Sequence, residues 1–338
     1  MKKLLLCTFT STFLIACGGS STDEKKQTGP TNPVKPVKPP IVPPIIPPII
    51  PPIIPPIIPP IIPPIVPPIV PPEPRNIHDI VPNVDYKNVP GIIKYIDFEN
   101  RQNGTYTSAM FKNDFINKWA SVTGKANIVD LNNSKVLAVT HPKGQYKKGI
   151  SGGKDLSEYE ELYFSYQITF GKNYDFSMGG KLPGLAGLNP DYDKNPDGCK
   201  PISENQGFSL RSMFRENGRA IGYFYHQDKT SKCGDEIDYQ HEGKNFSFKR
   251  ERTYLIEQYV KINDANQANG IVTIHVNGFK VLEKTHMTFS ENRIYAINYQ
   301  YFQLWHGGNS DRWAVDRDST AYFDNVMLSE IPVSYKLN

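Results

Sequence analysis

Residues 207–226 read GFSLRSMFRENGRAIGYFYH, and no other stretch of the 338-residue chain says more about its fold. Apolar and polar side chains alternate along the first half, which is the period of a β-strand with one buried face. Glu216, Asn217 and Gly218 then interrupt the alternation with residues typical of a tight turn, and an apolar and aromatic run follows. The stretch therefore predicts an antiparallel hairpin with one apolar face and one face that carries cations.

The register of this hairpin depends on the length of its loop. A two-residue Asn-Gly loop would place Tyr223 on the apolar side. A three-residue loop with Gly218 in the left-handed conformation instead pairs Arg211 with Tyr223 and Ser209 with Tyr225. We favour the three-residue loop because it gathers the polar groups on one face.

Similar short strands recur on both sides of the hairpin. YFSYQITF (163–170) is strand-like, and IVTIHV (271–276) runs through an Asn-Gly pair into FKVL (279–282). Helical periodicity is scarce, with residues 114–119 forming at most a turn or two. We therefore expect residues 89–338 to form one all-β domain, a β-sandwich jelly roll of two antiparallel sheets with a concave face.

The N-terminus has the pattern of an export signal. Two lysines precede an apolar run that is too short to span a bilayer, and the run ends in LIAC (14–17). This ending resembles the bacterial lipobox, in which the preceding peptide is removed and the cysteine is acylated. We expect a signal peptide at 1–16, a lipid anchor at Cys17 and a location in the bacterial cell envelope, at the outer membrane. An ordinary cleaved signal is disfavoured by the small residue before Cys17 and the polar run after it.

A proline repeat follows a polar tether at residues 17–38. Residues 39–72 repeat the tetrad Pro-Pro-Ile-Ile, with Val replacing Ile in places. Because each proline removes a backbone donor and fixes φ, the segment cannot be a core strand. Polyproline II at about 3.1 Å per residue gives it a reach of roughly 100 Å. We interpret residues 39–74 as a semi-rigid stalk rather than as a disordered linker of undefined reach.

Cysteine usage and charge limit the partners of the domain. Once Cys7 is removed with the signal and Cys17 is acylated, Cys199 and Cys233 remain, and in an oxidising compartment we expect them to form a disulfide. Removing residues 1–16 takes the 38 basic residues to 36, against 34 acidic ones. This balance argues against a nucleic-acid partner. Two cysteines with no Cys-x-x-Cys pattern give no reason to expect a metal site.

Several ordered motifs carry a family resemblance. They are GGKLPGL (179–185), SLR (209–211), FRENG (214–218), YFY (223–225), HGGNSD (306–311) with Trp313, and YFDN (322–325). Together they resemble polysaccharide lyase family 14, whose members are jelly-roll enzymes that cleave alginate or glucuronan. The resemblance covers roughly residues 91–338 and is sharpest between 179 and 225. It implies an enzyme that acts on an acidic polysaccharide.

The resemblance implies five active-site residues, namely Lys181, Ser209, Arg211, Tyr223 and Tyr225. A lyase removes the proton on C5 of a uronate and expels the oxygen on C4, which requires the neighbouring carboxylate to be neutralised. The lysine and the arginine supply positive charge, and a guanidinium can hold a carboxylate through two hydrogen bonds. The two tyrosines then act as base and acid if adjacent cations lower their pKa, although Lys181 is an alternative base. The serine would position the substrate.

Three further residues are candidates for substrate binding, namely Arg215, His226 and His306. The loop between Lys181 and Ser209 is long, and it leaves the identity of the uronate open among alginate, glucuronan and capsule-like polymers. The rival functions are a non-catalytic carbohydrate-binding module or a surface adhesin on a stalk. A base and a neutralising pair favour the lyase, since binding sugar does not require a base. We expect the protein to act as a monomer.

The same loop matches a calcium-binding pattern through Asp193, Asn195, Asp197 and Glu204. An EF-hand also needs a helix on each side, whereas the flanks here predict loop and strand. We therefore expect no cofactor and keep calcium at this loop as a minority hypothesis.

Overall fold

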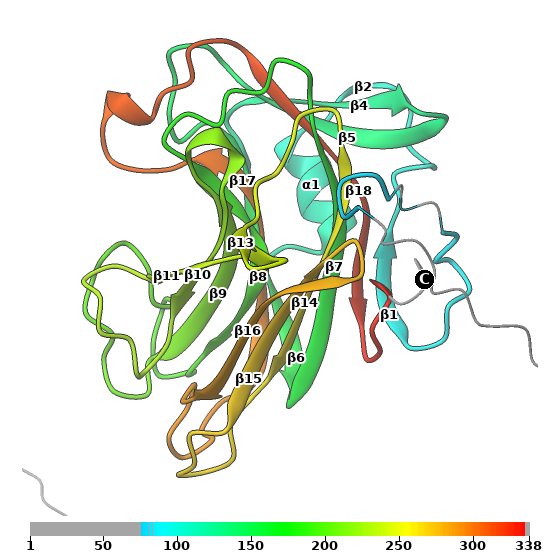
Figure 1. The fold of residues 1–338 in the computed structure, drawn as a ribbon. Coiled ribbons are helices and arrows are strands. Elements are labelled where there is room, and N and C mark those ends of the chain that lie inside the picture. The colour runs from blue at the N-terminus through cyan, green and yellow to red at the C-terminus, as the bar shows by residue number, and fades with distance from the viewer. Residues whose placement is uncertain (1–75, 81, 83, 335–338) are drawn as a thin grey trace, which may run out of the picture. The chain divides into compact units, whose positions relative to one another are not determined.

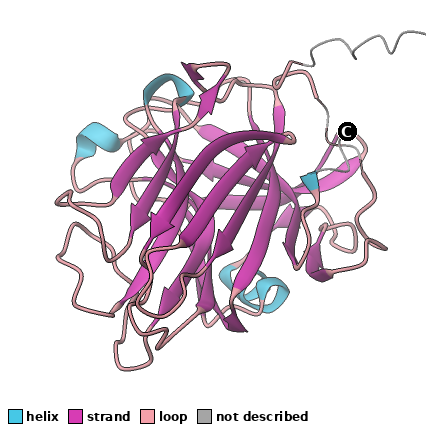
Figure 2. Ribbon diagram, turned by 60° about the horizontal axis from the view of Figure 1, so that its bottom comes forward, coloured by secondary structure: helices cyan, strands magenta, loops and turns pink. Residues whose placement is uncertain are grey.

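The computed structural model of the chain describes residues 76–80, 82 and 84–334, which Figure 1 shows in colour. The expected signal peptide (1–16), tether (17–38) and stalk (39–74), together with the acylation site at Cys17, lie outside these residues. Strands dominate the described part, as Figure 2 shows in magenta. The alternating pattern of the sequence thus becomes a β-sandwich of antiparallel sheets, which confirms the predicted jelly-roll fold.

The first sheet has seven strands and carries the motifs described above. Its strands in spatial order are β11 (Asp235–Asp238), β10 (Ala220–Tyr225), β9 (Gly207–Phe214), β8 (Gly180–Leu188), β17 (Ile297–His306), β6 (Gly149–Tyr159) and β3 (Trp119–Val122). All of its strand pairs are antiparallel. Segments far apart in the sequence therefore lie side by side, since β17 sits between β8 and β6.

The second sheet has nine strands and covers one face of the first. In spatial order they are β16 (Phe279–Met287), β15 (Gly270–Val276), β14 (Thr253–Lys261), β7 (Glu161–Phe170), β18 (Ser319–Ser329), β5 (Ser134–His141), β4 (Lys125–Leu131) and β2 (Gly104–Thr105), with β1 (Ile92–Ile96) paired to β18. A separate two-stranded sheet joins β12 (Gln240–His241) to β13 (Lys244–Asn245). The short helical elements are α1 (Ser108–Phe115), η1 (Glu216–Gly218) and η2 (Asp311–Trp313).

Aromatic side chains from both sheets meet in one continuous core. The rings of Phe302 on β17 and Phe323 on β18 lie 4.8 Å apart between centroids. Those of Phe214 on β9 and Phe170 on β7 lie 5.7 Å apart. Because neighbouring side chains of a strand point to opposite faces, residues that alternate with these project from the outer face of the seven-stranded sheet.

The β9–β10 hairpin has the predicted register. Arg211 pairs with Tyr223 and Ser209 with Tyr225. Arg215 and Arg219 close a three-residue loop, in which Gly218 has a φ of +79°. The polar and aromatic groups of the two strands consequently share the outer face of the sheet.

The helix lies earlier in the chain than the sequence indicated. We expected a turn or two at 114–119, whereas α1 spans Ser108–Phe115 and Trp119 begins β3. The Thr107 side chain caps the helix by accepting a hydrogen bond from the backbone N–H of Met110, and Ile116 ends it in the left-handed conformation. No helix in the described part of the chain is both long and apolar enough to cross a membrane.

The domain begins before residue 89, the expected boundary. Ile77 is only 2% exposed and belongs to the main core, and Tyr86 is fully buried against Leu255 and Val333. Asn277 donates hydrogen bonds from its amide to the carbonyls of Ile77 and Ile80. These contacts tie residues just after the proline-rich segment into the sandwich.

Candidate active site

A cavity of about 610 Å³ opens on the outer face of the seven-stranded sheet. Lys181 of β8, Arg211 of β9, and Tyr223 and Tyr225 of β10 all line it. Among its described lining residues are five basic side chains and three acidic ones. Four of the five residues implied as catalytic therefore meet in one cationic cavity on three adjacent strands.

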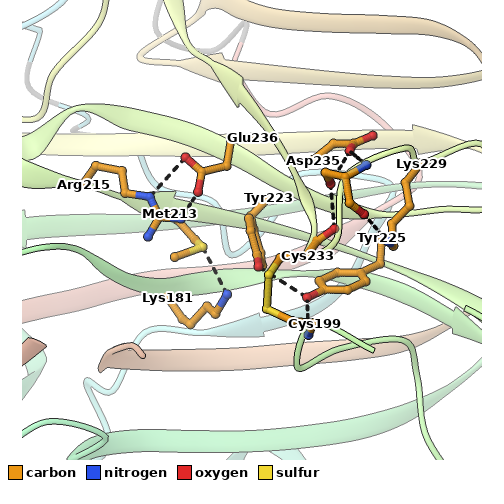
Figure 3. The surroundings of a disulfide bond; sticks show 11 residues. Lys181, Cys199, Met213, Arg215, Tyr223, Tyr225, Lys229, Cys233, Asp235 and Glu236 are labelled. Carbon is orange, nitrogen blue, oxygen red and sulfur yellow. Dashed lines mark hydrogen bonds and ion pairs between the residues drawn. A yellow bond between two sulfur atoms is a disulfide. The ribbon is translucent and has the colours of Figure 1, made fainter. Parts of the chain in front are cut away.

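Lys181 lies next to Tyr223 in this cavity (Figure 3). Its Nζ is 3.7 Å from the centre of the Tyr223 ring and donates a 3.2 Å hydrogen bond to Met213 Sδ. Burial, followed by the positive charges of Arg211 and Arg215, holds the pKa of the Lys181 amine well below its usual range. A lysine with a lowered pKa supplies the neutral amine that a general base needs.

Tyr223 and Tyr225 point their hydroxyl groups toward one another, with 3.3 Å between the oxygens. The backbone N–H of Cys199 also donates to the Tyr225 hydroxyl oxygen, at 3.0 Å. Burial and the hydrogen bond with Tyr223 raise the pKa of Tyr225 to about 12. Tyr225 therefore keeps its proton at neutral pH, which suits a general acid better than a base.

Arg211 is a buried cation without a carboxylate partner among the described residues. It is 4% exposed, its Nη1 donates a long 3.4 Å bond to Gln303 Oε1, and its guanidinium lies 5.4 Å from the centre of the Tyr301 ring. Its Nε has no hydrogen-bond partner in the described structure. A buried unpaired donor is costly, so the site favours an anionic ligand that can satisfy it.

Ser209 lies on the same face but contributes in a different way. It is fully buried, and its hydroxyl donates a 2.8 Å hydrogen bond to the carbonyl of Pro196. Its side chain thus holds the loop between β8 and β9 against the sheet, outside the cavity lining.

The predicted disulfide is confirmed, because Cys199 of the β8–β9 loop is joined to Cys233. Both cysteines line the cavity, so the disulfide forms part of its wall (Figure 3).

Arg215, a predicted substrate-binding residue, lies at the cavity edge. It forms an ion pair with Glu236 of the neighbouring strand β11 (Figure 3). Its guanidinium is also 5.8 Å from the centre of the Tyr223 ring and 5.7 Å from that of Trp313. One carboxylate is already paired to Arg215, but its Nη1 is buried without a hydrogen-bond partner in the described structure and remains a donor for a ligand.

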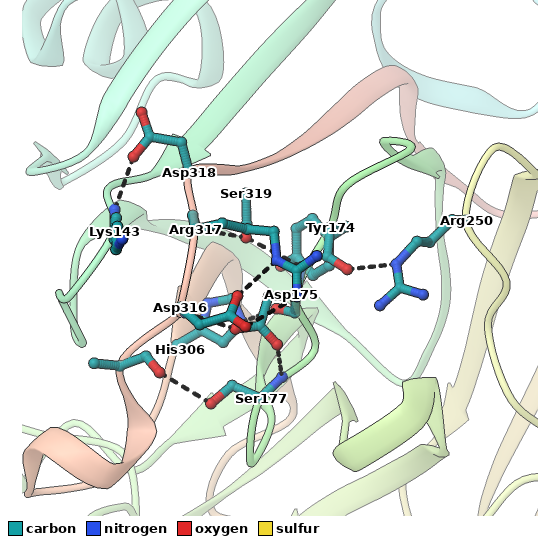
Figure 4. Close-up of polar contacts among 11 residues, drawn as sticks. Lys143, Tyr174, Asp175, Ser177, Arg250, His306, Asp316, Arg317, Asp318 and Ser319 are labelled. Atoms are coloured by element: carbon teal, nitrogen blue, oxygen red, sulfur yellow. Dashed lines mark hydrogen bonds and ion pairs between the residues drawn. The ribbon is translucent and has the colours of Figure 1, made fainter.

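His226 and His306, the other two predicted binding residues, lie outside the cavity lining. His226 is 3% exposed and bonds through Nε2 to Asp235, at 3.1 Å. His306 is fully buried and bonds through Nε2 to the carbonyl of Asp175, at 2.8 Å (Figure 4). Its ring also packs against His141, 4.5 Å away between centroids. In the described structure His226 is thus bonded to a carboxylate and His306 packs among aromatic rings, and neither lines the cavity.

The residues of the calcium pattern lie in the β8–β9 loop, which is flanked by strands rather than by helices. Asp197 lines the cavity, Asp193 and Glu204 are exposed, and Asn195 is buried. Within residues 76–80, 82 and 84–334, no three His, Cys, Asp or Glu side chains are grouped in a way that could hold a metal ion. The Glu204 carbonyl instead accepts a hydrogen bond from Tyr192.

Several residues that line the cavity were not among the predicted site residues. The main ones are Trp305 of β17, Trp313 of η2, Glu236 of β11 and Lys147 of the β5–β6 loop. For Trp305 a signal was available, because polar and aromatic side chains at 299–305 alternate with core residues. The other three lie on loops or edges whose approach to the cavity depends on tertiary structure.

Comparisons with known proteins place this site in a family. The profile of Polysaccharide lyase 14 matches residues 130–326, which include every cavity residue discussed so far. The chain therefore belongs to the polysaccharide lyase 14 family, and it is a polysaccharide lyase. This confirms the enzyme class that the motifs implied.

Solved structures and a curated protein show the same relationship. Alginate lyase Aly36B is 26% identical, with 70% of this chain and 96% of that one covered and a TM-score of 0.59. The PL-14 alginate lyase from Aplysia kurodai is 21% identical, with coverage of 70% and 98% and a TM-score of 0.56, and it supports the fold alone. Exolysin of Paramecium bursaria Chlorella virus 1 is 26% identical over 172 residues, or 44% of this chain. That match spans about a quarter of Exolysin, 26% of its length.

Proposed function

We propose that the protein cleaves a uronate-containing acidic polysaccharide by β-elimination in the cavity above β8, β9 and β10. The observation that carries the proposal is the meeting of three groups in one cavity. They are a lysine of lowered pKa, a buried arginine whose Nε has no hydrogen-bond partner in the described structure, and a hydrogen-bonded tyrosine pair. Elimination needs a base, a group that neutralises the carboxylate and an acid, and these three groups can supply them in that order.

Arg211 is the residue that would bind the carboxylate of the reacting uronate. Its Nε lacks a partner in the described structure, and a guanidinium can hold a carboxylate through two parallel hydrogen bonds. Neutralising that carboxylate makes the neighbouring C5 proton more acidic, because the enolate that forms carries less net charge. The relatives support this substrate class, since Aly36B is an alginate lyase and one of its double mutants is solved with alginate tetrasaccharide.

Lys181 is the base in this proposal. Its neutral Nζ takes the proton from C5, the electron pair forms the C4–C5 double bond, and the C4–oxygen bond breaks. Tyr225, with a pKa raised to about 12, or its partner Tyr223, gives a proton to the leaving oxygen. The products are one chain with an unsaturated uronate end and one with a new hydroxyl end. The alternative in which a tyrosine is the base is less well supported, because the pKa of Tyr225 is raised rather than lowered.

The test is a screen of the purified protein against defined polymers of mannuronate, guluronate and glucuronate. Ultraviolet absorbance of unsaturated uronate ends reports elimination, and an uncharged glucan of similar length is the control. We expect absorbance to grow with at least one polyuronate and not with the glucan. Binding of a polyuronate without any unsaturated product would reject the proposal and favour a carbohydrate-binding module.

We further propose that Cys17 is acylated and that residues 39–74 hold a monomeric domain away from the outer membrane of a bacterial cell. The support is the LIAC sequence and the proline repeat alone. Labelling of expressing cells with a radioactive fatty acid should mark the wild type and leave Cys17→Ser unlabelled. Equal labelling of both proteins would contradict the anchor.

A further inference from the structure

A second cavity, of about 280 Å³, lies on the same face of the seven-stranded sheet. Trp119 of β3 and Ser151 of β6 line it, and Lys147 and Trp305 line both this cavity and the larger one. The two cavities therefore adjoin at Lys147 and Trp305. Its volume is below the roughly 300–1,000 Å³ of pockets that enclose a whole drug-sized ligand, so it suits one segment of a longer ligand.

The strand order sets the separation of the two ends of this surface. Five strand spacings lead from β10, which carries the tyrosine pair, to β3, which carries Trp119. At roughly 4.8 Å per spacing this amounts to about 24 Å. Trp305 lies between them, because its backbone pairs with Lys181 on one side and with Gly149 on the other. A polymer that crosses the strands at the reacting residues would pass Trp305 before it reaches Trp119.

Trp119 is an exposed aromatic side chain that is held in a fixed orientation. It is 39% exposed, unlike the buried majority of the large apolar residues, and its indole N–H donates a 2.7 Å bond to the Tyr299 hydroxyl. Tyr299 packs edge-on against Tyr301, 4.9 Å away, and Tyr301 lies beneath Arg211. Fixed, exposed indole faces are suited to stacking on the apolar face of a pyranose ring, at little cost in conformational entropy.

A chain of polar contacts runs along the floor between the two cavities. Arg211 donates to Gln303 at 3.4 Å, and the Gln303 amide donates to Ser151 Oγ at 3.1 Å. Lys147 adds a positive charge at the junction, and its backbone N–H is fixed by a 2.9 Å bond to the His306 carbonyl. A line of polar contacts therefore links the two cavities and their junction is cationic, which matches a chain of sugars that carry carboxylates.

From these contacts we infer a distal subsite, formed by Trp119, Trp305, Lys147 and Ser151, that binds a non-reacting uronate of the same polysaccharide chain. The inference rests on the proposed function, because the occupant of the distal subsite is the continuation of the substrate held at Arg211. Trp119 acts there as a stacking platform that lengthens the stretch of polymer that the enzyme binds, and it takes no part in the reaction.

The test compares Trp119→Ala with the wild type on two substrates, a long polyuronate and the shortest oligouronate that the wild type cleaves. We expect the KM for the polymer to rise roughly three- to tenfold, as the loss of one aromatic contact implies, with kcat unchanged. The KM for the short oligouronate should stay the same, because this substrate does not reach β3. Trp119→Phe, which keeps a stacking face, should recover part of the lost affinity.

Ile93→Ala is the matched control, because Ile93 is also a large exposed apolar residue, at 43%, but lies on β1 of the other sheet. It should leave both KM values unchanged. An unchanged polymer KM in Trp119→Ala would overturn the inference, and so would an equal rise for both substrates, which indicates a structural effect.

A wild type that makes no unsaturated ends on any polyuronate would reject the proposed function instead. The subsite is then decided by calorimetric titration of long and short oligouronates into the wild type and Trp119→Ala. Tighter binding of the long oligouronate that is lost in Trp119→Ala would support the subsite. Equal affinities, or no binding at all, would overturn it.

Discussion

At the scale of single residues, the activity depends on how the charges around Lys181 set its protonation. Arg215 lowers the pKa of Lys181, whereas Glu236 raises it. The two residues form an ion pair with each other, so each can be neutralised with little change in shape. Neutralising Arg215 or Glu236 should therefore shift the pKa of Lys181 in opposite directions.

If Lys181 is the base, kcat/KM rises with pH through the pKa of Lys181. Arg215→Gln removes a like charge, which favours the protonated amine, so the acid limb of the profile should move up by about half a unit to one unit. Glu236→Gln removes an opposite charge and should move it down. The measurement is kcat/KM against pH for the three proteins. Shifts in the same direction for both variants would contradict the assignment of the limb to Lys181.

At the scale of elements, the β9–β10 hairpin was predictable because its signals are local. The alternation of side chains fixes which face each residue occupies, and Gly218 in the left-handed region fixes the loop length. The roles of Ser209 and His306 could not be predicted from strand periodicity, because they depend on tertiary contacts. Ser209 bonds to a loop carbonyl and His306 lies in a core of aromatic rings, and both contacts come from segments distant in sequence.

Gly218 offers a test of the hairpin loop. Its φ is +79°, and a Cβ there would lie 2.3 Å from the Phe248 carbonyl oxygen. Gly243 has a φ of +73° with open space around it, and it is the matched control. Gly243→Ala should cost roughly 1–2 kcal/mol of unfolding free energy from the backbone conformation, and Gly218→Ala should cost clearly more. Urea denaturation measures both, and equal losses would contradict the close contact.

The disulfide of the cavity wall is a second element-scale feature. Cys199 and Cys233 are 34 residues apart in the sequence. The backbone N–H of Cys199 also donates a hydrogen bond to the Tyr225 hydroxyl. Closing a loop of this length stabilises the fold by about 3–4 kcal/mol in the chain-entropy treatment. The double variant Cys199→Ser/Cys233→Ser should lose about this much in chemical denaturation, and added reductant should then have no further effect. A variant as stable as the oxidised wild type would refute this.

At the scale of the whole molecule, the core contains titratable groups that link stability to pH. Burial lowers the pKa of His141 from 6.5 to about 4, and burial together with His141 lowers that of His306 well below its usual range. The unfolded chain therefore binds protons below pH 6.5 that the folded core does not accept. The stability conferred by the neutral rings is complete above pH 6.5 and declines as the pH falls.

The free energy of unfolding should fall by about 1.4 kcal/mol per pH unit for each of these histidines between pH 6.5 and the lower pKa. His306→Gln removes one titrating group while keeping an amide that can reach the Asp175 carbonyl. Denaturation curves measured between pH 7.5 and about 4.5 should thus show that the free energy of unfolding falls less steeply with decreasing pH in the variant than in the wild type. Identical slopes would contradict the burial of a neutral His306.

Composition and alternation predicted the sandwich, whereas the full extent of the cleft depends on which strands become neighbours. Trp305 and Trp119 face the cavities because β17 lies between β8 and β6, with β3 at the sheet edge. This order is set by pairings across the whole domain. A local pattern could show that polar and aromatic side chains alternate with core residues at 299–305. It could not show which face of which sheet they would line.

The central claim is that Lys181 is the base in a cationic uronate site, and Lys181→Arg tests it most directly. Arginine carries a permanent positive charge and cannot be deprotonated, so it could neutralise a carboxylate yet cannot take a proton. On the best polyuronate we predict that kcat, measured as unsaturated ends formed, falls by about 10²–10⁴-fold, as does that of Lys181→Ala. Activity of Lys181→Arg close to that of the wild type would show that Lys181 supplies only charge and would contradict the account.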